Sequence, residues 1–113
     1  MDVIIVTTPY VQGYRVRQVL GIVSGLTART RGIGGKFIAG IESMVGGEVS
    51  AFTSEMEKAR VEALERLKDN ARRMGANGVI SVDIETSEIF QATVMISATG
   101  TAVILEADQV PPP

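Results

Sequence analysis

The residues of this sequence best suited to chemistry are two carboxylates that lie two positions apart. Asp83 and Glu85 belong to the alternating run Val79–Ser87, which is typical of a β-strand and places both side chains on one face. Hydroxyl residues alternate in the next run, at Thr93, Ser97, Thr99 and Thr101. If the two runs form a hairpin, these oxygens lie beside the carboxylates. Because Ca²⁺ and Mg²⁺ bind oxygen ligands, Asp83 and Glu85 are the candidate metal ligands.

Two other interpretations of this pair stay open. A face of Asp, Glu, Ser and Thr is also what the solvated side of an antiparallel sheet looks like. Alternate strand residues lie roughly 6 to 7 Å apart, a spacing that a glycosidase-like acid and base could use. Such an enzyme needs a formed cleft around its acids, but aromatic residues make up only 4% of the chain and Trp is absent. We therefore expect a protein that is not an enzyme.

The composition removes several classes of site. The chain has no Cys and no His, so it has neither disulfides nor thiolate or imidazole groups for catalysis or for binding soft metals. No cofactor can be identified from the remaining residues. A small ion or polar ligand is the kind of partner that the oxygen donors favour.

Basic residues gather in the first part of the chain. Residues 1–47 hold five Lys and Arg against two acids, whereas residues 48–113 hold six against eleven. Arg15, Arg17, Arg29 and Arg31 share one parity of a long apolar run. They could hold an anionic ligand, or they could pair with the acidic half of a neighbouring subunit. Nucleic-acid binding usually needs a stronger basic surface with stacking aromatics, so it is not expected.

The glycine-rich stretch Gly32–Phe37 does not have the spacing of a phosphate-binding loop. Thr30 stands where a Walker loop needs its first Gly, and Phe37 stands where it needs Ser or Thr after Lys36. The stretch therefore predicts a connection between a strand and a helix. Apolar residues then recur at helical spacing from Ile33 to Val45, which predicts a short helix ended by Gly46 and Gly47.

Five elements follow from hydrophobic periodicity and turn residues. They are a strand over Val3–Thr8, a long strand over Arg15–Arg31, a helix over Glu48–Met74, and strands over Asn77–Ile89 and Thr93–Leu105. Gly21 and Gly25 inside the long strand predict a bulge, a bend or close approach of another backbone. The helix has one apolar stripe, made of Phe52, Met56, Ala59, Ala63, Leu67, Ala71 and Met74. Gly75 ends it.

The length of 113 residues fits one domain, which we place at residues 1–107, followed by a Pro-rich tail over 108–113. The first residues lack a basic segment and a long apolar run, and about 18 consecutive apolar residues occur nowhere. We therefore expect a cytoplasmic protein without a membrane partner. Hydrophobic residues reach 45% with few aromatics, which indicates apolar surface shared with other chains.

Several short motifs, in their order and spacing, resemble the YbjQ-like (UPF0145) family. They are Thr7-Thr8-Pro9, Leu20–Gly25, Gly46-Gly47-Glu48, Ala59-Arg60 with Ala63-Leu64, Met74–Val79 and Ser97–Val103. The resemblance covers about Val3 to Leu105. It implies a small dodecin-like α+β subunit, with an antiparallel sheet and one long helix, in a closed homopentameric ring. It also implies heavy-metal binding, the property for which the family is labelled. The alternative is a structural or protein-interaction ring with no small ligand.

Overall fold

A computed structural model describes residues 2–30, 47–90 and 93–108 of the chain. The elements are β1 (Ile4–Ile5), β2 (Tyr14–Thr30), α2 (Gly47–Arg73), β3 (Gly78–Phe90) and β4 (Thr93–Ala107). The predicted order of strand, long strand, long helix and two strands is confirmed, with β1 much shorter than expected. The predicted short helix over Ile33–Val45 and the glycine-rich stretch 32–37 lie outside the described residues.

The four strands form one mixed sheet in the order β1-β3-β4-β2. β4 pairs antiparallel with both β2 and β3, and Phe90 faces Thr93 at the end of the predicted hairpin. β1 pairs parallel with β3, at Ile4 with Gly78 and Ile5 with Val79. The expectation of an antiparallel sheet is therefore wrong for this pair. The reason is that β1 and β3 are separated by β2 and α2, a connection long enough to bring the chain back to the same end of the sheet.

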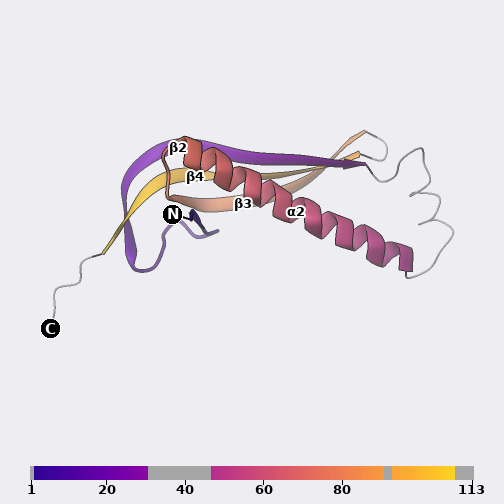
Figure 1. The fold of residues 1–113 in the computed structure, drawn as a ribbon, viewed down its shortest axis with the longest axis horizontal. Coiled ribbons are helices and arrows are strands. Elements are labelled where there is room, and N and C mark those ends of the chain that lie inside the picture. The colour runs from indigo at the N-terminus through magenta and orange to yellow at the C-terminus, as the bar shows by residue number, and fades with distance from the viewer. Residues whose placement is uncertain (1, 31–46, 91–92, 109–113) are drawn as a thin grey trace.

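α2 covers one face of the sheet, and its C-terminal half makes the contact (Figure 1). Ala59, Ala63, Leu67 and Ala71 have no exposed surface, which confirms this part of the predicted stripe. Met74 is 38% exposed, so the stripe ends before it. A Cβ at Gly25 would overlap the carbonyl oxygen of Ala63 and the nitrogen of Leu67. The helix backbone thus rests directly on β2, as the glycine had indicated.

β2 is long and bulged, and its larger apolar side chains lie on the face without the helix. Register shifts occur between Val16 and Gln18 and between Val19 and Gly21, where Gly21 has a φ of 133°. The predicted glycine bulge is confirmed at this position. Beyond it, Val23, Gly25 and Thr27 point toward α2 and are buried, whereas Ile22 is 79% and Leu26 50% exposed. Small residues are required under the helix because its backbone lies so close.

The junction between α2 and β3 is held by a set of local bonds. Gly75 has a φ of 88°, Gly75 N donates to Arg72 O, and Ala76 N donates to Ala71 O, which together make a Schellman end. The Asn77 side chain then bonds the main chain of Leu105 in both directions, donating from Nδ2 to O at 3.0 Å and accepting from N at 2.6 Å. Asn77 thereby extends the ladder between β3 and β4 by one step.

The molecule is elongated and its core is thin. The radius of gyration is 18.3 Å, against about 13 Å expected for a compact domain of this length. The buried cluster under α2 is built largely from Ala and Val, with Leu67 the largest fully buried side chain. No helix in the described part of the chain is long and apolar enough to cross a membrane.

Candidate functional site

A β-bulge at Ser81 brings Asp83 and Glu85 to the face of the sheet opposite α2. The register with β4 shifts between Ile80 and Asp83, and Ser81 has a positive φ of 55°. Val79 and Val82 both join the core under the helix, although they would point to opposite faces of an uninterrupted strand. Ile80 therefore does not share a face with Val82 and Ile84, as strict alternation would require, because of this extra residue.

The bulge is fixed by the N-terminal segment. Ser81 N donates to Thr8 O at 2.9 Å, and Val82 N donates to Val6 O at 3.0 Å. Two consecutive N–H groups of β3 therefore point to the same neighbour, which a regular strand does not allow. The bulge could not be predicted from the sequence, because Ser81 is neither Gly nor Asn, the residues that favour positive φ.

The two carboxylates line an open depression of about 370 Å³ on this face. Its lining residues are Ile22, Ser81, Asp83, Glu85, Thr99, Gly100 and Thr101. Asp83 lies opposite Thr99, and Glu85 lies opposite Ser97, as the predicted hairpin requires. Ser24 of β2 lies on the other side of Thr99, with its Oγ 3.4 Å from Thr99 Oγ1. The structure thus brings both carboxylates together with Thr99 and Thr101 in one depression. Thr93, another of the predicted hydroxyls, pairs instead with Phe90 at the end of the hairpin.

The oxygen donors of the depression suit a hard cation better than a heavy metal. Among the ion pairs of the described residues, none involves Asp83 or Glu85. No group of three or more His, Cys, Asp or Glu side chains meets within the described ranges. Two carboxylates with neighbouring hydroxyls resemble part of a Ca²⁺ or Mg²⁺ shell, which water or another chain would have to complete. Soft metals prefer thiolate or imidazole, and the sequence has neither.

Another carboxylate, Glu62 of α2, is already bound by donors of its own chain. Thr27 Oγ1 donates to Glu62 Oε1 at 2.7 Å, and Arg29 Nη2 donates to Oε2 at 2.6 Å. Arg66 Nη2 also lies 2.7 Å from Oε1. The Thr27 hydrogen bond, followed by that from Arg29, lowers the pKa of Glu62 below its ordinary value. This network ties α2 to β2 and gives Glu62 charge-balancing partners from its own chain.

Two of the arginines that could hold an anion, Arg15 and Arg29, have carboxylate partners within the chain. Arg29 is taken up by Glu62 and by Glu55, whose Oε1 lies 3.3 Å from Arg29 Nε. Arg15 forms an exposed pair with Glu106 at 3.3 Å. Arg31 lies outside the described residues. Arg15 and Arg29 therefore pair with acids of their own chain and do not meet in one anion site.

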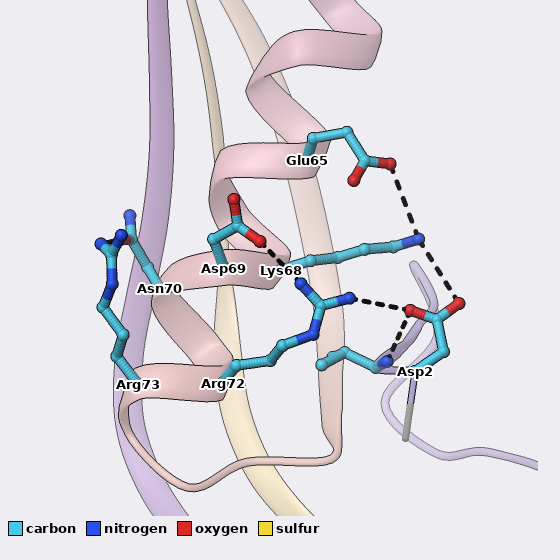
Figure 2. A network of polar contacts seen from close by, with 8 residues as sticks. Asp2, Glu65, Lys68, Asp69, Asn70, Arg72 and Arg73 are labelled. Carbon is cyan, nitrogen blue, oxygen red and sulfur yellow. Dashed lines mark hydrogen bonds and ion pairs between the residues drawn. The ribbon is translucent and has the colours of Figure 1, made fainter.

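A third polar group ties the N-terminus to the end of α2 (Figure 2). Asp2 accepts from Val3 N at 2.9 Å and from Arg72 Nη2 at 3.0 Å, and Lys68 Nζ lies 3.9 Å from its Oδ2. The Val3 hydrogen bond and then the Lys68 charge lower the pKa of Asp2. Arg72 also pairs with Asp69 at 2.6 Å, and Arg73 Nη1 donates to Asn70 Oδ1 at 2.9 Å.

Side chains of α2 also cover part of the outer edge of β2. Asn70 Nδ2 donates to Ser24 O at 2.7 Å, and Arg66 Nη1 donates to Leu26 O at 2.5 Å. These carbonyl groups point away from β4 and would otherwise offer a free sheet edge. An open groove of about 580 Å³ runs beside them. Sequence periodicity did not reveal this contact because both residues lie on the polar side of the predicted helix.

Comparison with known proteins gives a consistent family for this chain. The model of a family described as "Putative heavy-metal-binding" matches residues 3–106. A UPF0145 protein of Methanothermobacter thermautotrophicus is 49% identical over 108 residues, covering 96% of this chain and 95% of the relative. A UPF0145 protein of Methanocella arvoryzae is 45% identical over 107 residues, covering 95% and 89%. Neither name states an enzymatic activity.

The fold has also been seen by crystallography. A protein of unknown function from Pediococcus pentosaceus, of the DUF74 family, superposes with a TM-score of 0.62 at 15% identity. The match covers 92% of this chain and 98% of the other. It supports the same small α+β fold. With the family model spanning nearly all of its residues and relatives approaching half identity, the chain belongs to the YbjQ-like, UPF0145 family.

Proposed function

We propose that this protein is a non-enzymatic, self-assembling module that binds a hard cation or a small polar ligand on the open face of its sheet. The observation that carries the proposal is the depression in which Asp83, Glu85 and the hydroxyl groups of Ser81 and Thr99 line one surface. Every donor there is an oxygen. The family's description, "Putative heavy-metal-binding", supports a metal as the ligand, whereas the donor set of this chain favours Ca²⁺ or Mg²⁺ over a heavy metal.

Assembly of several copies would complete such a site. One chain supplies two carboxylates, whereas Ca²⁺ takes six to eight oxygen ligands. The same β2 face exposes Ile22 by 79% and Leu26 by 50%, which is unfavourable in a lone subunit with so thin a core. A closed homopentameric ring, as the family resemblance implies, would cover these side chains and bring further oxygen donors to the site.

Isothermal titration calorimetry with Ca²⁺, Mg²⁺, Zn²⁺ and Cu⁺ tests the cation site. We expect heat with a hard cation for the wild type and none for the Asp83→Asn/Glu85→Gln double variant, which keeps shape but removes charge. The matched control is Glu57→Gln/Asp108→Asn, since both acids are exposed and neither lines the depression. Absence of heat with every ion, or equal heat in the Asp83→Asn/Glu85→Gln variant, would rule the site out.

The alternative function is a structural or protein-interaction ring without a small ligand. It is favoured by the exposed apolar side chains of β2, which need a partner whether or not an ion binds. Light scattering should give about five subunit masses per particle, the number that the family resemblance implies for a closed cyclic assembly. A particle of this size that takes up no ion would leave the alternative function in place.

A matched pair of variants tests which surface assembles. Ile22→Asp/Leu26→Asp puts charges on the open sheet face and should reduce the particle to smaller species. Val61→Asp is the control, because Val61 is 59% exposed on the outer side of α2. A monomeric wild type would contradict self-assembly, and dissociation by Val61→Asp alone would place the contact on the helix.

A further inference from the structure

We propose that Asn77 is a deamidation site that is closed in the folded protein and becomes reactive when the junction between α2 and β3 opens. The chain has two asparagines, and they differ in the residue that follows. Asn70 precedes Ala71, whereas Asn77 precedes Gly78. Glycine has no Cβ to hinder its own nitrogen, so an Asn-Gly pair is the more reactive of the two in a flexible chain.

The reaction is an intramolecular acyl transfer that needs only water. The main-chain nitrogen of Gly78 loses its proton and forms a bond to Cγ of Asn77, which closes a five-membered succinimide ring. The bond from Cγ to Nδ2 breaks, and Nδ2 leaves as ammonia after taking up a proton. Water then opens the ring at either carbonyl and leaves aspartate or isoaspartate. One water is consumed, one ammonia is released, and nothing is oxidised or reduced.

The folded structure holds Asn77 away from this path. The amide makes two hydrogen bonds to the Leu105 main chain, at 3.0 Å from Nδ2 and 2.6 Å to Oδ1. The main chain of Asn77 is held as well, because its N donates to Val103 O at 3.2 Å and its O accepts from Ile4 N at 3.0 Å. Turning Cγ toward the Gly78 nitrogen would break both amide bonds and strain the neighbouring strands.

The space around Gly78 adds to the restraint. A Cβ at this position would overlap the Leu105 side chain, so the peptide that must move lies in a close-packed setting. Gly78 itself is buried. Movement of this peptide therefore requires separation of β3 from β4, which is an opening of the fold and not a loop fluctuation.

The product of the reaction no longer fits the same place. Aspartate at position 77 has two acceptor oxygens, so one of them would face the carbonyl oxygen of Leu105 where Nδ2 now donates. Isoaspartate adds a methylene group to the main chain, which would displace the bonds to Val103 and Ile4. A chain that has opened and deamidated therefore refolds poorly, so deamidation at Asn77 makes the unfolding irreversible.

Mass spectrometry of the full wild-type chain tests the proposal. The protein is incubated at mildly alkaline pH in increasing guanidinium chloride and then digested with trypsin. Asn70 and Asn77 fall into different peptides, because Lys68, Arg72 and Arg73 surround the first and no Lys or Arg follows the second. Asn70 thus serves as an internal control. We expect Asn77 to deamidate more than about tenfold more slowly in native buffer than in denaturing guanidinium chloride. Between these conditions its rate should rise with the fraction of molecules in which the junction is open.

Two results would overturn the proposal. Equal rates of reaction at Asn77 in buffer and in denaturant would show that the fold does not close the site. An Asn77→Asp variant with the same denaturation midpoint as the wild type would show that the product fits after all. If Asn77→Asp does not fold, the rates measured on the wild-type chain still decide the first point.

Discussion

The two faces of the sheet are built on different principles, although the same three strands form both. The face under α2 is made of small residues, with Gly25, Ala98 and Ala102 buried against the helix. The open face carries Ile22 and Leu26 beside Asp83 and Glu85, and it has no helix over it in the described structure. The face under α2 is covered by a helix of the same subunit. The other combines apolar and charged side chains in the way that a surface awaiting a partner does.

The two sets of carboxylates show the same difference. Glu62 on the helix side receives a hydroxyl and two guanidinium groups from its own chain. Asp83 and Glu85 have neighbouring hydroxyls but no ion pair among the described residues. A carboxylate whose partners are internal serves stability, and its charge is already balanced. Carboxylates without such partners are the ones available to a ligand or to another subunit.

The largest effect should come from closing the space beneath the helix. Gly25→Ala inserts a methyl group where the backbone of α2 lies, so the helix must lift from β2. Overpacking that side chains can relieve costs about 1–3 kcal/mol, but here backbone atoms of the helix are the obstacle, so the cost should exceed that of the other substitutions below. We expect loss of several degrees in the melting temperature or failure to fold. Ser24→Ala, at the adjacent residue on the open face, is the control and should leave the melting temperature nearly unchanged.

Two leucines allow the faces to be compared with the same substitution. Leu67 is fully buried under the helix, so Leu67→Ala should cost about 2–5 kcal/mol of unfolding free energy. Leu26 is 50% exposed, so Leu26→Ala should cost less than about 1 kcal/mol in an isolated subunit. Denaturation in guanidinium chloride measures both.

The outcome for Leu26 also bears on assembly. If its substitution costs as much as that of Leu67 and the cost falls as the protein is diluted, another copy covers the open face. A small, concentration-independent cost would instead mean that Leu26 stays in water, which would speak against the proposed contact surface.

A smaller effect is expected from the bound carboxylate on the helix side. Because the folded pKa of Glu62 is lowered, its charge stabilises the protein above the ordinary Glu pKa of 4.5, and this contribution is lost as the pH falls through the folded pKa. Glu62→Gln should therefore lower the denaturation midpoint at pH 7 and matter progressively less in acid. Midpoints measured from pH 7 to 3 test this; a difference that grows in acid would contradict it.

The smallest effect should come from the ion pairs that Asp2 forms with Arg72 and Lys68 near the end of α2. The pKa of Asp2 is lowered too, so its charge also stabilises the folded protein at neutral pH, and this stabilisation is lost in acid. The Asp2 side chain is 76% exposed, however, so water screens its ion pairs. Asp2→Asn should change the midpoint at pH 7 by an amount close to the error of the measurement. A loss as large as that for Glu62→Gln would mean that the N-terminal segment matters more to the sheet than its exposure suggests.

Hydrophobic periodicity and turn residues were sufficient to predict the long elements. The alternation in β3 and β4, the stripe of α2 and Gly75 at its end all have local causes, so they could be recognised from the sequence. Asp83 and Glu85 could likewise be placed together, because residues two apart in a strand share a face. The short parallel strand β1 could not, since two residues carry little periodicity and the pairing is decided by distant segments.

The features that were missed arise from tertiary contacts. The bulge at Ser81 depends on main-chain bonds to Thr8 and Val6, which lie far away in sequence. The cover over the edge of β2 uses Asn70 and Arg66, whose side chains have many other possible partners on a helix surface. The face of β2 that contacts the helix could not be predicted either, because apolar residues occur at both the odd and the even positions of the strand. Only the close approach of the helix backbone at Gly25 distinguishes the two faces.

The bulge at Ser81 has one more consequence, which concerns the alignment of β3. If Ser81 adopted an ordinary strand conformation without the extra step, every later side chain would change sides. Asp83 and Glu85 would then face Ala63 and Leu67 of the helix, and burying two charges there without partners would cost far more than the positive φ of one serine. The two carboxylates thus prevent β3 from slipping by one residue, so their charge determines the alignment of the strand even before any ligand is considered.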